Sequence, residues 1–136
     1  MKIGIKIGDI HEEDIQITEA YVQKFADFCG DFNPVHFDDD SAKAQGFKGR
    51  IAHGMVSASF FSKIFANTFP GPGAVYLNQT LKFHAPVYLN EKLHYRLEVI
   101  AQKEGKPFFT VKTEAFGPDQ ALRVSGEAMI RYQTPS

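Results

Sequence analysis

A short polar segment holds two side chains that could exchange protons with a substrate. Asp31 and His36 lie five positions apart in the stretch DFNPVH, on either side of an Asn-Pro pair. Asn33 precedes proline and is therefore disfavoured in helical geometry, and Asn-Pro favours a turn. An imidazole titrates near neutral pH, and burial can raise the pKa of a carboxyl group toward the same range. The segment therefore predicts a general acid–base pair, provided that the loop curls.

A purely structural role for the same segment stays open at this stage. Gly30 is well placed to end a preceding helix, and Asp31 would then cap the segment that follows. The catalytic role, unlike the structural one, needs a second element that binds the reacting group of a substrate.

The stretch AHGM, residues 52–55, predicts such an element at the start of a long apolar helix. The first N–H groups of a helix have no partner within the helix and carry partial positive charge. Glycine also lets a ligand approach the backbone closely. The N–H of Gly54 would therefore suit a thioester oxygen that becomes an enolate. The alternatives are that Gly54 is a small residue where helix meets sheet, and that His53 simply packs or caps.

Composition narrows the class of protein. The 136 residues predict one domain, residues 1–136, and 43% hydrophobic with 23% charged residues is ordinary for a globular protein. A net charge of −1 gives no reason to expect a nucleic-acid partner or an anionic membrane surface. Cys29 is the single cysteine, so an internal disulfide is excluded. No apolar stretch reaches the roughly 20 residues of a membrane span.

The first residues and the remaining histidines lead to two further expectations. The first residues alternate too quickly for a signal peptide, so we expect a cytoplasmic protein. The histidines outside the two motifs, His11, His84 and His94, lie on different elements without ligand spacing. We therefore expect no metal site.

The first half of the chain predicts helices after a short strand. Ile3, Ile5 and Ile7 alternate with polar residues and glycine, which indicates a strand over 3–7, and 15–17 could form a second one. Thr18 has the features of an N-cap, and helical spacing continues from it to Gly30. Shorter and longer helices are expected over 38–45 and 53–68. The longer one is apolar nearly all round, which indicates a buried helix.

The second half predicts strands joined by turns. Alternating patterns over residues 92–102, 109–115 and 122–132 follow a strand at 74–83, with turn residues between them. Such a meander has one apolar face that must be covered. The fold class we expect is therefore α+β, with a curved antiparallel sheet wrapped around the long central helix.

The two motifs together resemble a known family. The stretch GDFNPVHFD, residues 30–38, with IAHGM at 51–55, is similar to the hydratase 2 motif of MaoC-like (R)-specific enoyl-CoA hydratases. The resemblance extends over nearly the whole chain, and the length is similar to that of the short, single-hotdog members.

The resemblance implies a hotdog fold, a homodimer, and no cofactor besides the CoA thioester substrate. It implies addition of water to trans-2-enoyl-CoA to give (R)-3-hydroxyacyl-CoA. In that reaction Asp31 and His36 would hold the water and move its proton, in an order that stays open. The N–H of Gly54 would bind the thioester oxygen, and Asn33 would support the loop. Ser62 matches a serine that would support the site, although it could instead bond back to its own helix.

The sequence departs from the family pattern at two flanking positions. Cys29 stands where a serine is common, and Asp39 stands where a proline is common. Neither change removes an acid or a base. For the anionic CoA, Lys48 and Arg50 are candidates for a basic rim, and the alternative is that they belong to a solvated loop.

Three other functions remain open from the sequence. A 3-hydroxyacyl-ACP dehydratase would run the same chemistry on an acyl-carrier protein. A hotdog acyl-CoA thioesterase would share the fold but hydrolyse the thioester, and the DFNPVH loop argues against it. A non-catalytic acyl-CoA binding module would not need an intact acid–base pair.

Overall fold

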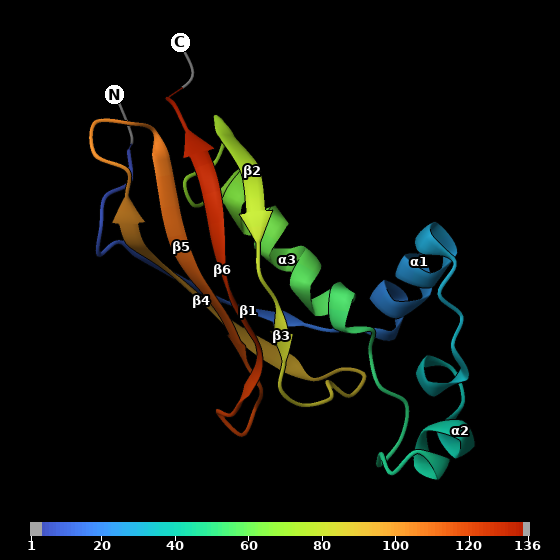
Figure 1. Ribbon diagram of the computed structural model, residues 1–136. Helices are drawn as coiled ribbons and strands as arrows, with labels where there is room; N and C mark the ends of the chain where they lie inside the picture. Colours follow the sequence, from blue (N-terminus) through green and yellow to red (C-terminus); the bar gives the residue numbers. More distant parts are fainter. Residues whose placement is uncertain (1–3, 135–136) are drawn as a thin grey trace.

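The computed structural model describes residues 4–134, which form a six-stranded antiparallel sheet with α3 packed against it and α1 and α2 to one side (Figure 1). The elements in chain order are β1 (Ile10–Gln16), α1 (Glu19–Cys29), a short 3-10 helix η1 (Pro34–His36), α2 (Asp39–Ala44), α3 (Gly54–Asn67), β2 (Ala74–Gln79), β3 (Lys82–Phe83), β4 (Lys92–Gln102), β5 (Phe108–Phe116) and β6 (Leu122–Tyr132). The strand order is β1-β4-β5-β6-β2, and β3 also pairs with β6.

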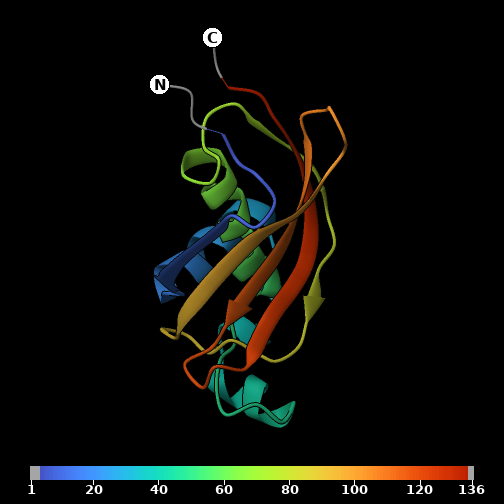
Figure 2. The same ribbon diagram turned by 90° about the vertical axis from the view of Figure 1, so that its left-hand side faces the viewer.

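The curved sheet lies around α3, as the two perpendicular views show (Figures 1 and 2). Phe61, Ile64 and Phe65 of α3 are buried in one core with the inward-facing residues of β4, β5 and β6. The buried Tyr95 hydroxyl donates a 2.6 Å hydrogen bond to the carbonyl of Ser57, which ties β4 to the helix. The predicted α+β hotdog architecture is confirmed.

The elements with regular patterns form where the sequence predicts them. β4 and β6 have the predicted bounds, and β5 is one residue longer at each end. α1 is capped by the Thr18 hydroxyl, which accepts from the N–H of Tyr21, and it ends at Gly30 with φ 87°. These positions follow from alternation and from capping chemistry, which are local properties of the chain.

The predicted strand over 3–7 is wrong for the part that the structure describes. Ile3 lies outside the described residues, and residues 4–7 are in no strand. Asp9 instead closes a turn, because its carboxylate accepts from the N–H of Lys6 and its own N–H donates to the Lys6 carbonyl. The first strand is Ile10–Gln16, which includes part of the short strand predicted at 15–17. It is a charged edge strand, so apolar alternation does not reveal it.

The predicted strand over 74–83 is divided into β2 and β3. The chain bulges between Tyr76 and Asn78, and Thr80 then crosses closely over β6. A Cβ on Gly126 would lie 1.8 Å from the Thr80 carbonyl oxygen, so this crossing requires glycine.

The long helix is not buried on every side, contrary to the prediction. An exposed stripe runs along one face of α3 in this single chain and consists of Met55, Ser59, Ser62 and Ala66.

Among the described residues, none of the helices has both the length and the apolar character needed to cross a bilayer.

Candidate active site

The motif loop is held in a tight curl by its own backbone and side chains. The Asp31 carboxylate accepts from the N–H of Asn33 at 3.1 Å. The Asn33 side chain in turn accepts from the N–H of Val35 at 3.2 Å and caps η1. The Asn33 carbonyl accepts from the N–H of His36 at 3.0 Å. This curl brings Asp31 and His36 to the same side of the loop.

Arg50 fixes the far side of the same loop. Its Nε donates to the His36 carbonyl at 2.8 Å, and its Nη1 lies 3.0 Å from the Glu19 carboxylate on α1. The guanidinium also lies over the Phe37 ring. Arg50 therefore supports the loop instead of standing free at a rim, whereas Lys48 is exposed.

His36 presents one nitrogen to Asp31. Its Nδ1 lies 2.8 Å from the carbonyl of Ile51, and since a carbonyl only accepts, this nitrogen carries the hydrogen. In the neutral ring Nε2 therefore has a free lone pair, and it lies 3.9 Å from Oδ2 of Asp31. That distance is too long for a direct hydrogen bond but leaves room for a bridging water.

Burial governs the protonation of His36, which is 8% exposed. Desolvation is the largest influence and lowers the pKa of His36 below its usual 6.5. The Ile51 carbonyl raises the pKa, His53 lowers it further, and the Asp31 carboxylate raises it. The net effect keeps the Nε2 lone pair available at neutral pH.

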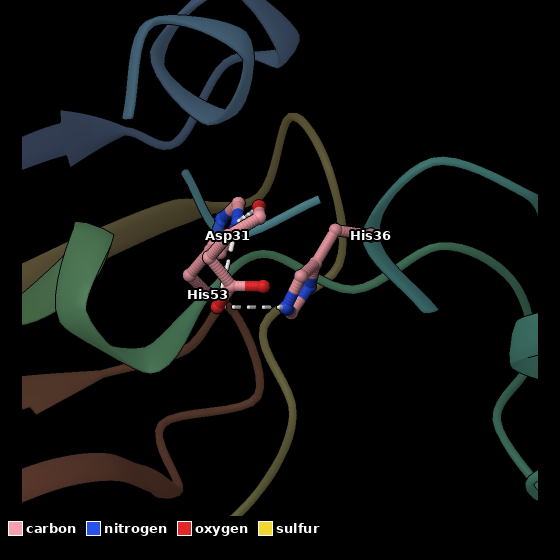
Figure 3. A group of neighbouring side chains, drawn as sticks. All are labelled: Asp31, His36 and His53. Atoms are coloured by element: carbon pink, nitrogen blue, oxygen red, sulfur yellow. Dashed lines mark hydrogen bonds and ion pairs between the residues drawn. The ribbon is translucent and has the colours of Figure 1, made fainter. Parts of the chain in front are cut away.

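A third side chain, His53, joins the pair (Figure 3), whereas the sequence indicated only that it packs or caps at the start of the helix. Its ring stacks on that of His36 with centroids 3.7 Å apart. Its Nε2 donates to the backbone carbonyl of Asp31 at 2.9 Å and lies 3.9 Å from the Asp31 carboxylate. Its position directly before Gly54 was the available signal.

The three side chains have the composition of a metal site, with potential ligand atoms within 4.8 Å of one another. The Asp31 carbonyl, however, requires a hydrogen on Nε2 of His53, so the nitrogen that lies nearest the Asp31 carboxylate has no lone pair to offer a metal ion. The arrangement thus suits proton transfer better than metal binding.

Gly54 begins α3 at the wall of a cavity of about 690 Å³, a size typical of ligand pockets. The cavity is lined by Asp31, His36, His53 and Gly54 together with mainly apolar side chains. A Cβ on Gly54 would lie 2.7 Å from the Phe83 ring, so the close approach of this ring to the helix start depends on glycine. An acid–base pair and a helix N-terminus therefore face one apolar cavity.

Ser62, which the sequence predicted to support the site, lies outside this cavity. It is on the exposed stripe of α3 and borders a groove that also includes Tyr76 and Leu77 of β2. It is not among the residues that line the cavity at Gly54.

The fold and this cavity define a hotdog protein with an acid–base site at the start of its central helix. A model of the MaoC like domain matches residues 6–116, and the chain belongs to this family. It is 40% identical over 128 residues to an (R)-specific enoyl-CoA hydratase of Aeromonas caviae, covering 94% of this chain and 96% of that one. It is also 35% identical to a mitochondrial 3-hydroxyacyl-[acyl-carrier-protein] dehydratase of Arabidopsis thaliana, covering 93% of this chain and 77% of that protein.

A solved structure of an (R)-hydratase is also similar to this chain in fold. The (R)-hydratase from A. caviae involved in PHA biosynthesis superimposes with a TM-score of 0.90 at 36% identity, covering 95% of this chain and 98% of that one. The two proteins therefore share one fold over that 95% of this chain.

Proposed function

We propose that this protein is an (R)-specific enoyl-CoA hydratase, which adds water reversibly to trans-2-enoyl-CoA. The observation that carries the proposal is the placement of Asp31 and His36, 3.9 Å apart, in one cavity with Gly54. The similarity to the A. caviae hydratase over nearly its whole length supports it.

A water molecule between the two side chains is the nucleophile in this proposal. Nε2 of His36 accepts one hydrogen, and the Asp31 carboxylate accepts the other, which orients the oxygen toward C3 of the enoyl group. The N–H of Gly54 donates to the thioester oxygen as negative charge builds up there. Each group thus acts where charge develops in the transition state.

The protons balance with His36 as the base. As the water oxygen bonds to C3, Nε2 of His36 takes the proton and the electrons of the double bond move to the thioester oxygen. The imidazolium then returns the proton to C2. Oxygen and proton both arrive from the side of Asp31 and His36, which gives syn addition. Water and substrate supply all the atoms, so this reaction requires no cofactor.

Two carriers fit the chemistry. The A. thaliana relative is named for acyl-carrier-protein substrates, so a 3-hydroxyacyl-ACP dehydratase is the second candidate. A thioesterase and a non-catalytic binding module are weaker candidates, because neither makes use of an acid–base pair aimed at C3 and C2.

One assay separates these functions. Crotonyl-CoA is incubated with the protein while enoyl absorbance, free thiol and product are followed. We expect absorbance to fall without thiol release, with 3-hydroxybutyryl-CoA as the product. Thiol release would indicate a thioesterase, and binding without turnover would indicate a binding module. A much higher kcat/KM for crotonyl-acyl-carrier protein would favour the dehydratase.

We also propose a homodimer formed through β2. This strand is at one edge of the sheet, and its Val75, Tyr76 and Leu77 are 42%, 37% and 47% exposed. An exposed apolar edge strand can pair with a strand of another chain, because its outer N–H and C=O groups have no partner in the sheet. A second copy across β2 would also cover the neighbouring exposed stripe of α3.

A further inference from the structure

His53 is a buried titratable group that the proposed mechanism does not use. It is 2% exposed and occupies the position directly before the first residue of α3. Aromatic rings enclose it, with centroids 3.7 Å away at His36, 4.9 Å away at Phe25 and 6.2 Å away at Phe37. A phenyl ring would fit such surroundings by shape and polarity.

The polar atoms of His53 are unequally used. Nε2 donates to the Asp31 carbonyl at 2.9 Å, whereas Nδ1 is buried and has no hydrogen-bond partner within residues 4–134. A buried polar atom without a partner is destabilising, and a phenyl ring would avoid this. The Nε2–H is therefore the feature that distinguishes histidine from phenylalanine here, and it acts on Asp31.

We propose that His53 is a positioning residue that holds the proton-transfer pair in register with the thioester-binding end of α3. Its Nε2–H fixes the main chain of Asp31 and its ring face fixes the ring of His36 (Figure 3). Its own backbone continues into Gly54, the first residue of α3. One side chain thus connects the three groups on which the proposed function depends. The inference rests on that function.

The electrostatics agree with this role. Two titratable groups, Asp31 and His36, face the His53 ring, while its neighbours Phe25 and Phe37 are uncharged. His53 is one of the influences that lower the pKa of His36. Its presence therefore helps to keep Nε2 of His36 free to accept a proton.

Two substitutions separate the contributions of His53. His53→Phe keeps an aromatic ring but removes the N–H. His53→Gln removes the ring but keeps an N–H donor near the position of the His53 Nε2, which donates to the Asp31 carbonyl. His94→Gln is the control, because His94 is paired with Asp14 and Glu12 on an exposed part of the sheet. We expect kcat with crotonyl-CoA to fall ~10- to 100-fold in both His53 variants, with KM nearly unchanged. The control should match the wild type.

Two further readouts exclude a merely structural role. The melting temperature of His53→Phe should stay within about 5 °C of the wild type, because relief of the unpaired Nδ1 offsets the lost hydrogen bond. In His53→Gln, the His36 pKa followed by NMR should rise toward 6.5, with the same shift in the acid limb of the rate profile. Wild-type kcat and His36 titration in both variants would overturn the inference.

The outcomes also separate this inference from the proposed function. Absence of hydration by the wild type would refute the function, and the NMR titration would still test the contact between the two histidines. An active wild type with fully active His53 variants would refute the positioning role alone. If His53→Phe does not fold, kcat and the titration of His53→Gln decide the question.

Discussion

The tautomer of His36 is the residue-level feature on which the mechanism depends. The Ile51 carbonyl places the hydrogen on Nδ1, so Nε2 is the atom that can accept a proton. Sequence reasoning selected Asp31 and His36 as a pair but could not assign their roles, because the assignment depends on a carbonyl 15 positions away from His36.

The pH dependence of the reaction should report the environment of His36. Burial lowers its pKa below 6.5, so the base remains unprotonated as the pH falls through 6.5 and is lost only when the pH reaches the lowered pKa. We therefore expect the acid limb of kcat/KM to lie below pH 6.5. An acid limb at or above pH 6.5 would contradict the assignment of His36 as the base.

The same shift affects folding with a defined sign. The unfolded chain binds the proton more readily than the folded one, so His36 favours the folded state above pH 6.5 and this contribution is lost as the pH falls toward the lowered pKa. Urea unfolding at pH 7.5 and pH 5 should therefore show a smaller loss of stability in His36→Gln than in the wild type. Equal losses would contradict burial as the dominant influence.

Removal of either reacting group should impair catalysis without unfolding the protein. We expect Asp31→Asn and His36→Gln to lower kcat by at least ~10²-fold, the low end for general acid–base catalysis. Steady-state kinetics and circular dichroism would check activity and folding together. Folded variants with nearly wild-type rates would show that these residues are not the reacting pair.

At the level of elements, the start of α3 joins the loop to the cavity. The sequence predicted this helix over 53–68, one residue longer at each end than observed, and the strands β4 to β6, because each has a strong local pattern. It did not predict the contact of Phe83 with Gly54 or that of Arg50 with the His36 carbonyl. These contacts join segments that lie far apart along the chain and share no periodic pattern. Only the end of the charged edge strand β1 was predicted, at 15–17, because the rest of it shows no apolar alternation.

Gly54→Ala tests the close approach at the helix start. The new Cβ would lie 2.7 Å from the ring of Phe83, which is 49% exposed and must turn aside, so we expect a cost at the low end of the about 1–3 kcal/mol typical of overpacking. We expect lower stability in urea and a loss in kcat/KM of at least ~10-fold. Phe83→Ala alone serves as the matched control. Adding it to Gly54→Ala should restore stability but not activity, and full recovery of both would limit the role of Gly54 to packing.

At the scale of the whole molecule, the open edge at β2 and the exposed stripe of α3 lie on neighbouring surfaces, bordering one groove. The sequence could not reveal this surface, since its helix pattern was compatible with full burial. A helix that is only partly covered by its own sheet is explained if a second copy covers the rest.

Leu77→Arg should weaken such a dimer. Leu77 is 47% exposed at the bulge of β2, and a charge there would be placed in the proposed interface. We expect light scattering to show a dimer for the wild type and a monomer for the variant at micromolar concentration. Ile100→Arg on β4, which β5 and β6 separate from β2 in the sheet, should remain dimeric. A monomeric wild type would refute the proposal.

The stereochemistry of hydration in D₂O tests the central claim most directly. The mechanism delivers oxygen to C3 and deuterium to C2 from the same side, where Asp31 and His36 lie together. Proton NMR coupling constants and chiral analysis of the product should therefore show (R)-3-hydroxybutyryl-CoA with deuterium added syn to the oxygen. An S product, or anti addition, would contradict the account.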